Sequence, residues 1–275
     1  MLQQRLLRAP GSRAAACGSR AAAPRPFSPA AAPMRTVGSA PRRSVVAAAD
    51  LDPDNASILV CGGGGVALHV TRKLKDMGSW VWMLQRKEDR RKDIEGMMAI
   101  VAKGDALNKE DVEKVFAGIE EVDAVVSTIG GSVADPNADS FGNINIIEAA
   151  AKKGVKKFIL VTSIGCGSSK AAPGDKVYEV LKPVLLEKDK AEAALKAHAD
   201  KMAYTIIRPG GLQTEAATGN GVLTADASVC GAITREDTAA LVVKALFSSK
   251  TDNQVLSAVD KGKLSSQGAF EEFAL

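Results

Sequence analysis

Four consecutive glycines, Gly62 to Gly65, follow a short apolar run at 57–61 and precede a helical pattern at 66–77. A strand, a glycine turn and a helix in this order present backbone N–H groups to the phosphates of a nucleotide. The hexamer from Gly62 to Ala67 reads G-x-G-x-x-A, a permitted form of the dinucleotide-binding fingerprint. We expect Gly62 to make the tight turn and Gly64 to let the backbone approach a pyrophosphate. A glycine turn without a ligand is the alternative, and the flanking strand and helix favour the nucleotide site.

Apolar runs alternate with helical patterns along the rest of the chain. The predicted strands cover 57–61, 80–84, 98–102, 123–127, 157–162, 203–207 and 254–258, and the predicted helices cover 66–77, 109–118, 140–153, 184–198 and 236–247. Asn108 and Thr234 are expected to cap helices, because acidic residues follow each of them. Repeated β-α units imply a parallel sheet with right-handed crossovers. The predicted fold class is therefore α/β, a Rossmann-type doubly wound parallel sheet of about seven strands in a single domain at 56–262, followed by a peripheral tail at 263–275.

The first 49 residues contain eight arginines and no Asp or Glu, and most of the remainder is Ala, Pro, Ser and Gly. This composition is typical of an organelle transit peptide, and it lacks the long apolar stretch of a secretory signal or membrane span. We therefore predict a disordered transit peptide at 1–48. Its Ala-, Arg- and Pro-rich sequence resembles a chloroplast leader and predicts a location in the stroma, with the mitochondrion as the alternative. A basic tail that binds nucleic acid or a membrane is the competing interpretation.

Removal of such a leader reverses the net charge. The leader holds eight of the 36 basic residues and none of the 32 acidic ones, so the formal charge changes from +4 to −4. A negative mature protein with 4% aromatic residues in the whole chain is not expected to bind nucleic acid. The cysteines that remain, Cys61, Cys166 and Cys230, have no spacing typical of a zinc site or a disulfide framework. No metal site is predicted, and Cys166 is a candidate for redox sensitivity.

The end of the second predicted strand indicates which dinucleotide binds. An NAD enzyme usually places Asp or Glu there to hold the ribose hydroxyls, whereas this chain has Gln85, Arg86 and Lys87. The Arg86 guanidinium can bind a 2′-phosphate bidentately. A charge-assisted contact of about 1.5–3 kcal/mol gives roughly ten- to hundredfold preference. The predicted cofactor is therefore NADP(H), with a solvated run of charged residues as the alternative.

Further candidate cofactor contacts follow the other predicted strands, at the edge of the sheet where Rossmann folds bind ligands. Asp105 is expected at the adenine edge and Ser163 at the level of the nicotinamide. The segment from Pro209 to Gly211 could wrap the nicotinamide amide. The full set of predicted cofactor contacts is Gly62, Gly64, Gly65, Val66, Arg86, Asp105, Thr128, Gly130, Lys188, Pro209, Gly210 and Gly211.

From Ile58 to about Asp260 the chain resembles the atypical short-chain dehydrogenase/reductases, in particular the NAD(P)-binding NmrA-like group and its plastid and cyanobacterial members. The segments that carry the resemblance are 104–105, 123–127, 143–150, 161–165, 187–192 and 204–212. One departure is visible, because Leu68 stands where the family's G-x-x-G-x-x-G loop has its last glycine. The resemblance implies a role for Lys188 at the cofactor ribose.

Catalytic members of this family use Ser followed by Tyr-x-x-x-Lys, in which the tyrosine delivers a proton as the hydride arrives. The resemblance places Lys188 at the lysine position, but Val184 occupies the tyrosine position and cannot donate a proton. A second Tyr-x-x-x-Lys begins at Tyr178, 15 residues after Ser163. Pro183, directly after this motif, argues against a helix there. Ser163, Tyr178 and Lys188 are the candidate catalytic residues.

Three functions follow from this pattern. The first is an NADPH-dependent reductase of a small or planar acceptor, such as a quinone, a flavin or a carbonyl compound. The second is a non-catalytic NADP(H)-binding assembly factor or redox sensor of the plastid. RNA binding is the third, and the mature charge disfavours it. The polar composition fits a monomer or weak homodimer without a membrane span, whose partner is a small-molecule substrate.

Overall fold

The computed structural model describes residues 51–265 and 268–275, so the predicted transit peptide lies outside the described residues. The strands are β1 Ser57–Cys61, β2 Trp80–Gln85, β3 Ile100–Lys103, β4 Ala124–Ser127, β5 Lys157–Val161, β6 Ala203–Pro209, β7 Gly211–Gln213, β8 Gly221–Thr224, β9 Ala232–Thr234 and β10 Gln254–Asp260. The α-helices are α1 Gly65–Asp76, α2 Arg91–Gly96, α3 Lys109–Gly118, α4 Asn143–Lys153, α5 Asp175–Ala197 and α6 Arg235–Leu246. A π-helical turn, Ala138–Gly142, leads directly into α4.

Eight strands form the main sheet in the order β3-β2-β1-β4-β5-β6-β10-β8. All neighbours are parallel except β8, which runs antiparallel to β10 at one edge. β1 pairs with both β2 and β4, and Val60 lies opposite Met83 on one side and Val126 on the other. The chain order reverses at this point, which is the switch point where doubly wound sheets bind ligands. The predicted Rossmann-type fold in a single domain is confirmed, with β8 as an eighth strand.

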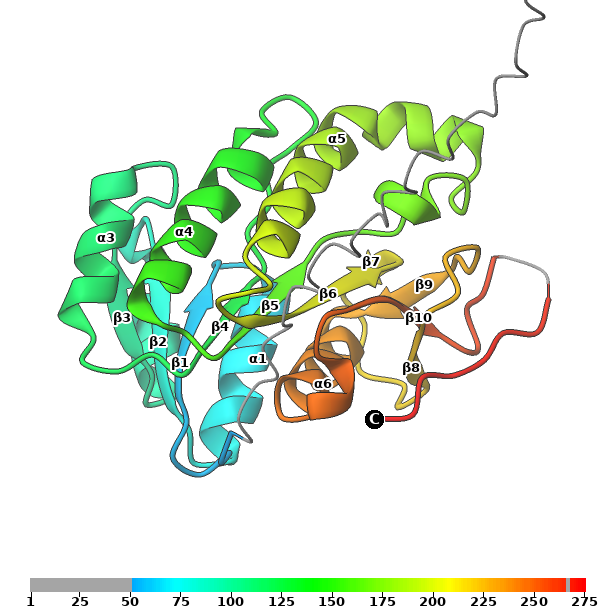
Figure 1. The fold of residues 1–275 in the computed structure, drawn as a ribbon. Helices are drawn as coiled ribbons and strands as arrows, with labels where there is room; N and C mark the ends of the chain where they lie inside the picture. The colour runs from blue at the N-terminus through cyan, green and yellow to red at the C-terminus, as the bar shows by residue number, and fades with distance from the viewer. Residues whose placement is uncertain (1–50, 266–267) are drawn as a thin grey trace, which may run out of the picture. The chain divides into compact units, whose positions relative to one another are not determined.

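Helices cover both faces of the sheet (Figure 1). On one face, α1 and α6 bury Val70, Leu74 and Val242 against Ile58 and Val60 of β1. The other face carries α3, α4 and α5, whose apolar residues pack on the alternate side chains of the same strands. Because both faces are covered, the strands read as near-continuous apolar runs.

Several element boundaries differ from the prediction. Helix α5 begins at Asp175 and continues through Pro183, so the predicted start at 184 was wrong. A proline inside a helix removes one backbone hydrogen bond, here the one to the Glu179 carbonyl. Both residues are exposed, so water can satisfy that carbonyl. Strand β3 begins two residues later than predicted, because Met98 has a left-handed backbone (φ 58°).

The C-terminal residues lie against the edge strand β8. The Phe273 N–H donates to the Leu223 carbonyl at 2.7 Å, and Thr224 Oγ1 donates to the Glu271 carbonyl at 2.7 Å. Among the described residues, none of the helices combines the length and the hydropathy needed to cross a bilayer.

Candidate functional site

Two adjoining cavities lie at the carboxyl ends of the central strands. The first has a volume of about 430 Å³ and lies over the ends of β1, β2 and β3. The second has a volume of about 900 Å³ and lies between the ends of β5 and β6 and the helix α5. Gly64, Thr128 and Gly130 line both cavities. The two cavities are therefore halves of one cleft across the switch point of the sheet, which has room for an extended two-part ligand.

The glycine turn forms the shared floor of this cleft. Gly62 has a φ of +130°, a backbone conformation that favours glycine, and a Cβ there would lie 2.5 Å from Thr128 Oγ1. A side chain at this position would therefore strain the backbone and clash with Thr128. Gly64 is the N-cap of α1, no side chain bonds that cap, and the first turn holds no acidic residue. Open space lies beside Gly64, where a Cβ would meet no atom within 4 Å. Backbone N–H groups and the positive end of the helix dipole therefore face the cleft, as phosphate binding requires.

Gln85 holds the glycine turn in place. Its buried side chain donates from Nε2 to the Gly62 carbonyl at 2.7 Å. A Cβ at Gly63 would lie 2.9 Å from the Gln85 side-chain oxygen, so turn and amide are packed closely. No role for Gln85 was predicted from the sequence. Its position at the end of a buried strand, directly before Arg86, was the available signal.

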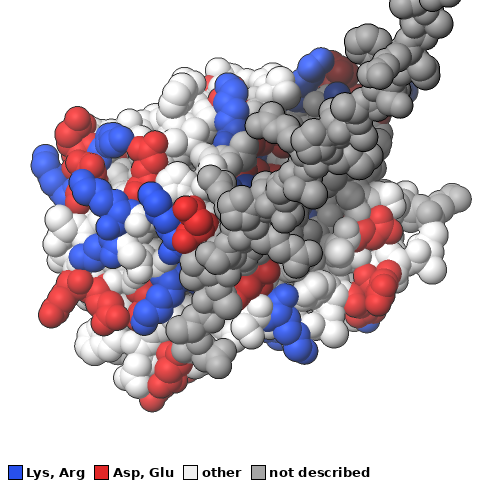
Figure 2. Space-filling view, viewed as in Figure 1, with Lys and Arg blue, Asp and Glu red and all other residues white. Residues whose placement is uncertain are grey.

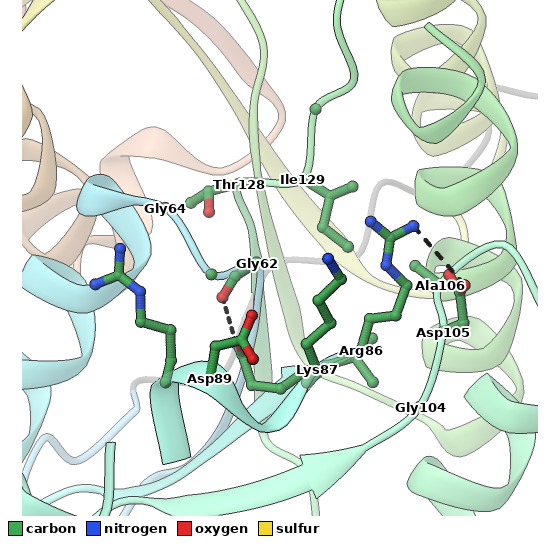
Figure 3. Close-up of a pocket in the computed structure, with 15 residues that line it drawn as sticks. Gly62, Gly64, Arg86, Lys87, Asp89, Gly104, Asp105, Ala106, Thr128 and Ile129 are labelled. Atoms are coloured by element: carbon green, nitrogen blue, oxygen red, sulfur yellow. Dashed lines mark hydrogen bonds and ion pairs between the residues drawn. The ribbon is translucent and has the colours of Figure 1, made fainter. Parts of the chain in front are cut away.

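Arg86 and Asp105 meet at the mouth of the first cavity (Figure 3). Arg86 Nη1 lies 3.9 Å from Asp105 Oδ2, and the two side chains are 63% and 35% exposed. Lys87 also extends from the end of β2 into this cavity (Figure 3). An exposed pair at this distance contributes little stability. The Arg86 guanidinium can therefore leave Asp105 and bind a phosphate at a small cost in free energy.

Lys188 lines the second cavity and is paired with a buried carboxylate. Its Nζ lies 2.6 Å from Asp139 Oδ1, and the other Asp139 oxygen accepts the Gly131 N–H at 2.7 Å. Asp139 is fully buried and the Lys188 side chain is 12% exposed. A Cβ at Gly130 would lie 3.1 Å from Asp139 and 3.3 Å from Lys188. Asp139 thus fixes the ammonium beside Gly130, a role that the sequence analysis did not foresee.

Tyr178 lies apart from the other two candidate catalytic residues. Ser163 and Lys188 line the second cavity, whereas Tyr178 is not among its lining residues. The Tyr178 ring is buried against Cys166 and Leu185, with Lys170 Nζ 5.0 Å from its centroid. The motif is helical, and its tyrosine packs in a small cluster with Leu181, a residue that does line the cavity. The structure brings Ser163 and Lys188 to one cavity and does not bring Tyr178 to it, and the proton-donor role of Tyr178 stays a prediction.

Arg208 lies at the end of β6, directly before the cavity-lining residue Pro209, and it forms a buried ion pair with Glu192. Its guanidinium donates to both Glu192 oxygens, at 3.0 and 2.6 Å, and Thr162 Oγ1 donates to the same carboxylate at 2.8 Å. The thiol of Cys166 lies within 4.8 Å of carboxylate oxygens of Glu192 and Asp189. Burial raises the pKa of Cys166 to about 12. Because Arg208 already takes both Glu192 oxygens and the thiol stays protonated, this cluster is a structural ion pair and does not fit a metal site.

Arg235, the first residue of α6, is a second cation that the sequence analysis missed. It lines the second cavity beside the start of α1, and a Cβ at Gly65 would lie 2.8 Å from Arg235 Cδ. Its Nη1 donates to Thr214 Oγ1 at 2.8 Å, and also contacts the Leu212 carbonyl at 3.4 Å. Within the described part of the chain, Arg235 has no carboxylate partner. A cation beside the N-terminus of α1 adds to its attraction for phosphate.

The structure brings the predicted cofactor residues together. Each of the twelve lines one or both cavities: Gly62, Gly64, Gly65, Val66, Arg86, Asp105, Thr128, Gly130, Lys188, Pro209, Gly210 and Gly211. Figure 2 shows Lys and Arg interspersed with Asp and Glu on the viewed face of the described residues.

The fold and this cleft define a Rossmann-type dinucleotide-binding protein, and sequence comparison gives the family. A profile described as NAD(P)H-binding matches residues 62–249. The chain therefore belongs to this NAD(P)H-binding family, which confirms the predicted NmrA-like relationship.

Individual relatives agree with this assignment. An uncharacterized sugar epimerase of Bacillus subtilis, YhfK, is 34% identical over 176 residues, which are 62% of this chain and 77% of that protein. An uncharacterized chloroplastic protein of Arabidopsis thaliana is 31% identical over half of each chain. Among solved structures, ChuY, an anaerobilin reductase of Escherichia coli O157:H7, has a TM-score of 0.67 at 26% identity, covering 78% of this chain and 100% of that one.

Proposed function

We propose that this protein is an NADP(H)-dependent oxidoreductase that transfers hydride to a small or planar acceptor. The observation that supports this most directly is the single cleft with two unlike halves. One half combines a phosphate-binding turn with Arg86, and the other combines Ser163 and Lys188 with an apolar wall. Similarity to ChuY, a reductase, is consistent with this class of reaction.

The residues of the cleft fit the parts of NADP(H). The turn at Gly62–Gly64 and the start of α1 would hold the pyrophosphate, and Arg235 would add a charge-assisted contact. Arg86 would bind the 2′-phosphate and Asp105 would meet the adenine edge. In the other half, Lys188 would bind the ribose. The bound cofactor supplies a hydride, and the protein's own residues orient it and the acceptor.

The nicotinamide half favours acceptors that need no dedicated acid. Tyr178 is not among the residues that line the second cavity, and the Ser163 hydroxyl donates to the Ile164 carbonyl at 2.9 Å. Quinones and flavins can accept a hydride and take their proton from water. A ketone depends more on a positioned proton donor. We therefore rank a quinone or flavin above other carbonyl acceptors.

A non-catalytic NADP(H)-binding protein, acting as an assembly factor or redox sensor, is the second candidate. The absence of a tyrosine among the described residues that line the cleft favours it. Turnover separates the two candidates. The purified full chain should oxidise NADPH in the presence of at least one member of a panel of quinones, flavins and aldehydes. If it binds NADPH but oxidises none with any acceptor, the second candidate replaces the first.

We further propose that the protein works in the chloroplast stroma. The Arg-rich first 49 residues and the chloroplastic relative support this location. A fluorescent fusion to the C-terminus of the full chain should co-localise with chlorophyll, and a mitochondrial pattern would contradict the proposal. A monomer or weak homodimer is expected in light scattering during gel filtration.

A further inference from the structure

We propose that the described C-terminal residues, 263–265 and 268–275, belong to the acceptor site, and that Phe270 is a positioning residue for one wall of the second cavity. The inference rests on the proposed reductase function and adds a determinant of acceptor binding. Phe270 lines neither cavity, so it would act on the acceptor through the residues that it supports. None of the described C-terminal residues lines the first cavity, so the cofactor half should not depend on them.

Three chain segments lie side by side in this wall. The Gly231 carbonyl accepts the Gly211 N–H at 2.9 Å, and Gly231 also forms an antiparallel bridge with Leu264. The Ser265 N–H donates to the Cys230 carbonyl at 2.9 Å. The segments after β6, before β9 and after β10 thus all contribute lining residues, which are Pro209, Gly210, Gly211, Leu212, Cys230, Gly231 and Ser265.

The three segments are packed backbone against backbone. A Cβ at Gly210 would lie 2.2 Å from the Gly231 carbonyl oxygen, and a Cβ at Gly231 would lie 2.7 Å from the Lys263 carbonyl oxygen. Closely packed segments transmit a displacement to their neighbours, because no free space absorbs it. A shift of the segment after β10 should therefore move Cys230 and Gly231, and with them the shape of the acceptor half.

Phe270 lies against the apolar cluster that supports this wall. The cluster consists of the buried residues Ile164, Val229 and Val259. Leu264, from the wall itself, packs on the same cluster as Phe270. Ile164 also lines the second cavity. The half-buried Phe270 side chain therefore holds the chain that follows Leu264 against residues of the acceptor half.

A second phenylalanine anchors the same segment at a different place. Phe273 packs on the main core cluster that contains Leu223 of β8, and its N–H donates to the Leu223 carbonyl. Figure 1 shows the chain ending beside this edge strand. Phe270 and Phe273 are both half-buried, three residues apart, and differ in the cluster that each contacts. They provide a matched pair of substitutions.

Kinetics separate a positioning role from a general loss of stability. We would measure NADPH oxidation by the full chain with duroquinone and with riboflavin as acceptors. Phe270→Ala should raise the KM for the acceptor about tenfold, with a smaller change in kcat and an unchanged dissociation constant for NADPH. Phe273→Ala should lower the free energy of unfolding and leave the KM unchanged. Phe270→Leu should act in the same direction as Phe270→Ala but more weakly, and it replaces that variant if the alanine protein does not fold.

Iodoacetamide labelling of Cys230 tests the wall without turnover. Displacement of the segment that pairs with Cys230 should expose this residue, so labelling should be several times faster in Phe270→Ala than in Phe273→Ala or the unmodified chain. If no protein reduces either acceptor, the reductase proposal fails and the labelling rates alone decide this inference. An unchanged KM where turnover occurs would overturn the role of Phe270, and so would unchanged labelling or equal effects of the two alanine substitutions.

Discussion

Asp139 holds the Lys188 ammonium at 2.6 Å beside Gly130, at the junction of the two halves of the cleft. The carboxylate comes from the turn before α4 and the lysine from α5. The pair therefore joins two elements that are far apart in the sequence, and it fixes a cation where we place the cofactor ribose.

Replacing Asp139 with asparagine should weaken both the fold and cofactor binding. Removing one partner of a buried pair costs about 3–5 kcal/mol, and the smaller figure is expected because Lys188 can reach solvent. Urea unfolding and NADPH titration would measure the two effects. Glu187→Gln is the control, because the Glu187–Lys190 pair is more exposed. An Asp139→Asn protein with wild-type stability and affinity would contradict the role of this pair.

Gln85→Leu should loosen the glycine turn without creating a large cavity. The Gly62 carbonyl loses its donor, and a buried unsatisfied polar group costs about 1–3 kcal/mol. We expect lower NADPH affinity together with a lower free energy of unfolding. If stability falls but the dissociation constant for NADPH is unchanged, Gln85 supports the core and not the phosphate turn.

Gly62→Ala tests the turn itself. The φ of +130° and the 2.5 Å approach to Thr128 Oγ1 should cost about 1–3 kcal/mol of unfolding free energy and most of the NADPH affinity. Gly118→Ala is the matched control, because a Cβ there meets no atom within 4 Å. Equal behaviour of the two variants in thermal unfolding and NADPH binding would show that the turn does not need glycine at 62.

Cys166 should resist alkylation. Its pKa of about 12 leaves very little thiolate at pH 8, and the thiol is fully buried. Cys230 is half-buried and lines the second cavity. Iodoacetamide labelling followed by mass spectrometry should therefore modify Cys230 well before Cys166, and urea should abolish the difference. Rapid native labelling of Cys166 would instead support a redox role.

The cofactor half of the site was largely readable from the sequence. The glycine run fixed where the first strand ends, and Arg86 and Asp105 follow neighbouring strands, so parallel pairing brings them to one edge. The predicted caps are also confirmed, because Asn108 accepts the N–H groups of Glu110 and Asp111, and Thr234 accepts that of Asp237.

The catalytic half was less readable, because it depends on which way side chains of one long helix point. Pro183 suggested a helix start, yet α5 runs through it. Tyr178 and Lys188 are ten residues apart, which separates them by about 80° around a continuous helix, and the sequence pattern did not indicate which of these directions faces the cleft. Asp139 and Arg235 contact residues that are far from them in the sequence, so no local sequence pattern indicated their roles.

The most direct test of the whole account is the affinity of the full chain for NADPH compared with NADH, measured by fluorescence titration. We predict that NADPH binds about ten- to hundredfold more tightly, and that Arg86→Ala removes this preference by weakening NADPH alone. Arg72→Ala, an exposed arginine on α1 outside the lining of the cleft, should leave both affinities unchanged. Equal affinities for the two cofactors in the unmodified protein would contradict the account.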